Sequence, residues 1–88
     1  MTQFSDIDMR AIEAIRRAAY FTATLAFGRG RYRVEERPTV LAAMDAAREI
    51  EQDPAAHTRR ALVYAIAPDG HATLLTSALI AKLLSLES

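Results

Sequence analysis

Two strand–turn–strand segments on either side of an alanine-rich stretch constrain the fold of this 88-residue chain. The first spans residues 20–36 and turns at Gly28-Arg29-Gly30, and the second spans residues 61–76 and turns at Pro68-Asp69-Gly70. Glycine adopts the left-handed backbone that tight turns need, and Asp-Gly is a strong hairpin signal. Two hairpins around one helix predict an α+β fold, with a small, mostly antiparallel sheet of three to four strands and helices packed on one face.

Three helices complete the predicted order, α-β-β-α-β-β-α, in a single α+β domain over residues 1–88. Ser5 opens the first helix, Thr39 caps the second, and Thr76 or Ser77 caps the last. These side chains accept hydrogen bonds from the unpaired N–H groups at a helix start. A right-handed crossover from the second strand to the third predicts the sheet order 2-1-3-4.

The spacing of the larger apolar residues predicts the core. Apolar side chains recur at helical spacing in residues 7–19 and 40–50, and alternate in the strand segments. Alanines in the second helix let it lie close to the sheet. The larger residues expected in the core are Ile7, Ile12, Ile15, Phe21, Leu25, Phe27, Tyr32, Val34, Met44, Ile50, Leu62, Tyr64, Ile66 and the C-terminal leucines.

The charge balance and the missing cysteines exclude several classes of protein. Eleven lysine and arginine residues balance eleven acidic residues, so the chain lacks the positive excess of a general polyanion binder. The absence of cysteine excludes disulfides, thiolate zinc sites, iron–sulfur clusters and cysteine nucleophiles. No apolar run approaches 18 residues, and residues 1–10 lack a signal-peptide pattern. We therefore expect a soluble cytoplasmic protein that does not contact a membrane.

No group of residues predicts catalysis. Asp69 beside His71 is the one pair that suggests acid–base chemistry, but a hydrolase also needs a nucleophile and an oxyanion site, and Asp69 suits the turn. His57 has no neighbour at metal-ligand spacing. The Gly28-Arg29-Gly30 turn lacks the spacing and the lysine of a phosphate-binding loop. We predict that the protein is not an enzyme and has no cofactor and no catalytic, cofactor-binding or metal-binding residue.

Four arginines gather around the first hairpin: Arg29, Arg31, Arg33 and Arg37. Alternate strand residues project to one side about 6.6 Å apart, so Arg31, Arg33 and either Glu35 or Arg37 share a side, in a ribbon suited to follow a nucleic-acid backbone. The competing interpretation is an edge strand kept soluble and unpaired by its charges. Glu35 and Glu36 in the same strand favour that second interpretation.

The last predicted helix carries a broad leucine-rich surface. Its candidate dimer-interface residues are Leu79, Ile80, Leu83 and Leu84. The apolar residues of this helix cover an arc wider than the roughly 100° apolar stripe of a surface helix. Contiguous exposed apolar surface usually marks an interface. The alternative is that this helix completes the core of the monomer.

The middle of the chain resembles short bacterial domains of unknown function. The resemblance rests on residues 32–34, on Ala46-Ala47-Arg48-Glu49-Ile50, on Val63 and on Asp69-Gly70, and it covers about residues 25–75. These domains share a strand–strand–helix–strand layout and an "EA…AREL"-like helix, where this chain has Met44-Asp45 in place of the usual Glu-Ala. The resemblance implies the layout and no activity.

Two hypotheses of function follow from the sequence. The favoured one is a small interaction or structural module that forms a homodimer or binds an unidentified protein partner. The alternative is a nucleic-acid-binding accessory domain that acts through the arginine-rich hairpin.

Overall fold

The structure is a computed structural model that describes residues 5–56, 59–76 and 78–82. Its order of helices and strands is the predicted one, which confirms the α+β fold class. A helical turn at residues 78–82 follows the last strand. The elements before it are α1 (Asp6–Arg17), β1 (Tyr20–Gly28), β2 (Arg31–Arg37), α2 (Val40–Glu51), a 3-10 turn (Pro54–Ala56), β3 (Leu62–Ile66) and β4 (Ala72–Leu75).

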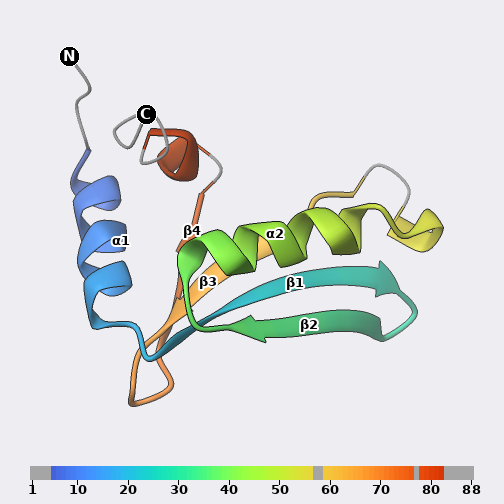
Figure 1. Cartoon of the computed structure of the whole chain (residues 1–88), viewed down its shortest axis with the longest axis horizontal. Helices are drawn as coiled ribbons and strands as arrows, with labels where there is room; N and C mark the ends of the chain where they lie inside the picture. Colours follow the sequence, from blue (N-terminus) through green and yellow to red (C-terminus); the bar gives the residue numbers. More distant parts are fainter. Residues whose placement is uncertain (1–4, 57–58, 77, 83–88) are drawn as a thin grey trace.

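The four strands form one antiparallel sheet in the order β2-β1-β3-β4. This is the predicted strand order. Thr24 in β1 lies opposite Val34 of β2 on one side and Leu62 of β3 on the other. The helix α2 runs along the β1–β2 hairpin, and α1 lies beside β3 and β4 (Figure 1).

The hairpin turns form where the glycines allow a left-handed backbone. Gly28, Arg29 and Gly30 all have positive φ, at 93°, 55° and 74°. In the second hairpin Gly70 has a φ of 92°, and the Asp69 carboxylate accepts a hydrogen bond from the backbone N–H of His71 at 2.9 Å. Both turns therefore depend on their glycines, which adopt these conformations cheaply, and the first turn also holds Arg29 in the left-handed region that non-glycine residues seldom adopt.

Side-chain caps begin each helical segment. The Ser5 hydroxyl accepts from the Asp8 N–H, and the Asp8 carboxylate accepts from the Ser5 N–H, each at 3.1 Å. The hydroxyl of Thr39 accepts from the N–H of Ala42 at the start of α2, and that of Thr76 accepts from Leu79. The predicted caps at Ser5, Thr39 and Thr76 are confirmed.

The core lies between the helices and one face of the sheet, and it is rich in alanine. Ile50 and Leu79 are the largest side chains that are almost fully buried among the described residues. Small side chains on both layers let α2 approach β1 closely. The buried cluster consists of Ala11, Phe21, Ala23, Leu25, Ala43, Ala46, Ala47, Ile50, Ala56, Val63, Ala65, Leu75 and Leu79.

Four residues expected in the core are exposed, so those predictions are wrong. Ile7 is 73% exposed, since the buried side of α1 carries Asp8 and Ala11 instead. Tyr32 is 70% exposed, and Val34 and Leu62 are 44% and 46% exposed. These three side chains lie on the sheet face that the helices leave uncovered.

Candidate interaction surface

The sheet has one face under the helices, the covered face, and one face without them, the open face. Strand register assigns each residue to a face, because successive side chains of a strand point to opposite sides. Leu74 is 43% exposed on the open face, in the same row as Thr22 and Tyr64. The open face consists of Tyr20, Thr22, Thr24, Ala26, Tyr32, Val34, Glu36, Leu62, Tyr64, Ile66, Ala72 and Leu74.

The strand β2 presents its charged side to the covered face and its apolar side to the open face. Arg33 and Glu35 lie opposite Leu25 and Ala23, which are buried core residues. Tyr32 and Val34 therefore point away from α2. In a stable monomer the apolar side of an edge strand is expected to face the helices and the charged side to face water, because apolar burial drives folding and charges prefer water.

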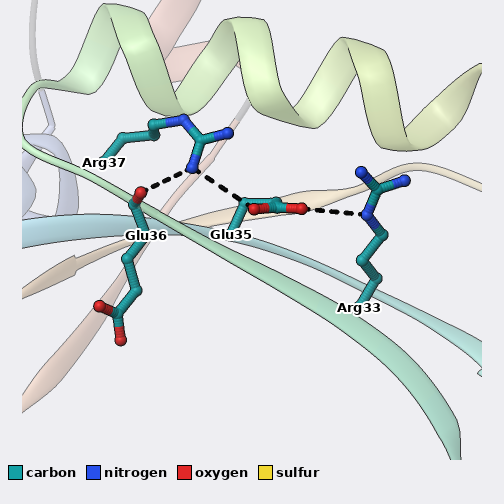
Figure 2. Close-up of polar contacts among 4 residues, drawn as sticks. All are labelled: Arg33, Glu35, Glu36 and Arg37. Carbon is teal, nitrogen blue, oxygen red and sulfur yellow. Dashed lines mark hydrogen bonds and ion pairs between the residues drawn. The ribbon is translucent and has the colours of Figure 1, made fainter.

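The charged side of β2 is internally paired. Figure 2 shows Glu35 between the guanidinium groups of Arg33 and Arg37, on the side of the sheet where α2 lies. The Arg33 Nε donates to one carboxylate oxygen at 3.1 Å, and the Arg37 Nη1 donates to the other at 3.4 Å. The hydrogen bond from Arg33, helped by the charges of both arginines, holds the pKa of Glu35 below its ordinary value. These charges therefore stabilise one another at the border of the helix layer.

The structure divides the four predicted nucleic-acid arginines into two pairs. Arg33 and Arg37 engage Glu35, and Arg37 also donates to the backbone carbonyl of Glu36 at 2.7 Å. Arg29 and Arg31 lie at the hairpin tip and take part in no ion pair within the described part of the chain.

Arg59 is a fifth arginine at this hairpin, and sequence reasoning missed it. Its Nη1 donates to the backbone carbonyl of Ala26 at 2.9 Å, across 33 positions of sequence. Its guanidinium nitrogens lie 3.7 and 3.8 Å from the Cβ position that a side chain at Gly28 would occupy. No local pattern marks such a contact, since it depends on the path of the chain from α2 to β3.

The predicted dimer-interface residues of the last helix lie in different surroundings. Leu79 is 1% exposed and belongs to the core, and Ile80 is half-buried against it. Leu83 and Leu84 lie outside the described residues. The described part of this helix therefore serves the core of the single chain. Of the large apolar side chains that are exposed in the described residues, four lie on the sheet and three on α1 and α2: Tyr32, Val34, Leu62 and Leu74, and Ile7, Met9 and Leu41.

The candidate acid–base pair is a turn. The carboxylate of Asp69 bonds the backbone of His71 and not its imidazole, and His57 lies outside the described residues. Among residues 5–56, 59–76 and 78–82, no three acidic or histidine side chains are placed to hold a metal ion. Within the same ranges, no helix has the length and apolar character needed to cross a membrane.

Comparisons with family models, with curated protein sequences and with solved structures give no match for this chain. The resemblance to short bacterial domains of unknown function stays a prediction. What the chain does is therefore argued from its own surfaces.

Proposed function

We propose that this protein is a small interaction module whose contact surface is the open face of its sheet. The observation that supports this proposal is the orientation of β2, which holds Tyr32 and Val34 in water and turns Arg33 and Glu35 toward the helix layer. A partner that covered the open face would bury the apolar side of β2. Its own surface must then be apolar and free of unpaired charge, because burying a charge without a partner is costly.

The make-up of the open face suits binding. Four large side chains contribute to it while each keeps more than two fifths of its surface exposed: Tyr32, Val34, Leu62 and Leu74. Burying apolar surface contributes about 25 cal/mol per Å². Tyrosine is also among the residues that dominate binding energy at protein interfaces. The face therefore combines an aromatic anchor with aliphatic neighbours on three strands.

The first test is photo-cross-linking inside cells that express the protein naturally. A photoreactive amino acid replaces Val34 on the open face, and a matched variant carries it at Leu41, which is 48% exposed on α2. We expect discrete adducts from position 34 and few from position 41. Equal labelling from both positions, or none from position 34, would contradict an interaction through the open face.

Nucleic-acid binding through the hairpin tip is the competing proposal, and the position of Arg59 favours it. Arg29, Arg31 and Arg59 bring three positive charges to one end of a neutral chain. Phosphate contacts would make affinity depend on salt, with a slope of about 0.9 per contact for duplex DNA. We expect fluorescence anisotropy at low salt to show no binding tighter than high micromolar. Submicromolar binding that is lost when these three arginines become alanine would reverse the ranking.

A further inference from the structure

We infer that the occupant of the open face is a second copy of this chain, packed sheet against sheet around a two-fold axis. This inference rests on the proposed function and names the partner for the same surface. Three properties of the open face support a second copy: its charge, the order of large and small side chains across its strands, and its size.

The open face carries almost no charge. Glu36, at the β2 edge, is its one formally charged side chain. Two copies packed face to face therefore bring no arginine or lysine of this face into the contact, and each glutamate stays at the rim. The whole chain has a formal net charge of zero, so long-range repulsion between copies is weak.

The side chains of the open face are self-complementary across the strands. The central strand β1 contributes small residues, namely Thr22, Thr24 and Ala26, whereas its neighbour β3 contributes Leu62 and Tyr64. A two-fold axis between β1 and β3, parallel to the strands, lays β1 of one copy over β3 of the other. Small residues then meet large ones in the centre of the interface.

The same axis also matches the two edge strands. It places β2 of each copy over β4 of its partner. An axis parallel to the strands keeps each row of residues at its own height. Glu36, in the row of Thr22, Tyr64 and Leu74, therefore lies at the rim over Leu74 of the other copy, and Val34, in the row of Thr24 and Leu62, lies over the end of β4. Sheets that pack in this aligned way lie about 10 Å apart with their strands within about 30°. An interface of this kind uses the same patch on both copies, as two-fold dimers do.

The size of the open face predicts a weak dimer. Four strands spaced about 4.8 Å apart and about six residues long cover a projected area of about 20 Å by 20 Å. Monomers rarely expose an apolar patch of several hundred Å² without a function for it. Standard interfaces bury about 800 Å² per partner and smaller ones belong to weak or transient complexes, so a face of this size favours a weak dimer.

Sedimentation velocity of the purified chain, from about 1 to 500 μM, tests the inference. We expect the mass to rise from 9.7 kDa toward twice that value with increasing concentration. Leu62→Asp and Val34→Asp should each raise the dissociation constant at least tenfold. Leu41→Asp, at an equally exposed position on α2, should leave it unchanged. Circular dichroism of each variant checks that the fold is retained.

Thiol cross-linking locates the contact in the wild-type fold. The chain has no cysteine, so Leu62→Cys and Leu41→Cys each carry one reactive thiol. Leu62 lies on β3 beside the proposed axis, so a short bis-maleimide should join two chains at position 62 and not at position 41.

Different failures have different meanings. A monomer at every concentration would overturn the second-copy inference, and so would a dimer that tolerates both open-face substitutions. If photo-cross-linking at position 34 in cells still gives adducts with another protein, the proposed function stands without the dimer. If position 34 gives no adducts with any protein, both proposals fail.

Discussion

The two faces of the sheet are built from different side chains: small ones pack under the helices, and larger ones stay exposed on the other side. The covered face packs under two helices with a core in which seven of the thirteen residues are alanine. Alanine allows close approach of the layers but buries little area, so this core stabilises a thin, two-layered monomer. The open face carries Tyr32, Val34 and Leu62, side chains of core size that folding of one chain leaves exposed.

The largest effect should come from shortening a buried side chain under the helices. Ile50 is fully buried on α2, so Ile50→Ala removes transfer energy and leaves a cavity. Such changes cost roughly 2–5 kcal/mol, a large part of the total stability of a small domain. Urea unfolding at a concentration where the chain is monomeric measures the loss. A midpoint within error of the wild type would show that the covered face is not the folding core.

Enlarging a side chain on the covered face should lower the free energy of unfolding by less than Ile50→Ala does. The loss should still exceed that from enlarging a side chain on the open face. Ala43 is fully buried where α2 meets the sheet, and Ala43→Leu forces the two layers apart at a cost of about 1–3 kcal/mol. Ala26→Leu, on the open face, adds the same atoms to an exposed position. Thermal unfolding of both variants should lower the melting temperature only for Ala43→Leu. Equal losses would mean that the open face is packed within the monomer.

Local sequence was sufficient to predict the elements of both faces. Gly28, Gly30 and Gly70 take the left-handed backbone that the turns need, and Thr39 caps α2. The strand order followed from the two hairpins and one crossover. Alternation in β2 separated Tyr32 and Val34 from the arginines, as the structure confirms, but period two alone does not say which side the helices cover.

What the sequence did not predict depends on contacts between distant segments. The Lys82 ammonium donates to the Asp8 carboxylate at 2.8 Å across 74 positions, and Arg59 reaches Ala26 across 33. Leu79 is a further example, because its helical spacing marked it as an interface candidate and the structure buries it in the core. The alternation in β2 put Tyr32 and Val34 in the core, because it does not show that Arg33, Glu35 and Arg37 pair with one another on the side of the helices.

The ion pair between Asp8 on α1 and Lys82 in the last helical turn should make the stability of the protein depend on pH in acid. The hydrogen bond from Lys82, followed by the one from the Ser5 backbone, holds the pKa of Asp8 below its ordinary value of 3.8. The unfolded chain binds this proton at higher pH than the folded chain does. The stabilisation is therefore present above about pH 4 and is lost as pH falls through the lowered pKa.

Asp8→Asn isolates this contribution. The amide keeps an oxygen for the Ser5 N–H but loses the charge that pairs with Lys82. We expect the variant to be less stable than the wild type near neutral pH, and the difference to shrink as the pH drops below about 4. Urea midpoints across that range measure it. A difference that does not change with pH would contradict the ionic role of Asp8. The pKa of Glu35 is also lowered, so Glu35→Gln measures separately how much that carboxyl contributes to the acid sensitivity.

The smallest effect on the monomer should come from the open face itself. Val34 is 44% exposed, so Val34→Ala should change the free energy of unfolding of the monomer by no more than about 1 kcal/mol. The same variant should behave differently at high protein concentration. A dimer stabilises the folded state by mass action, so the wild-type melting temperature should rise with concentration while that of Val34→Ala stays nearly constant. Differential scanning calorimetry from about 10 to 500 μM compares the two. A large loss in the dilute variant would place Val34 in the folding core, and parallel concentration dependence in both proteins would remove it from the interface.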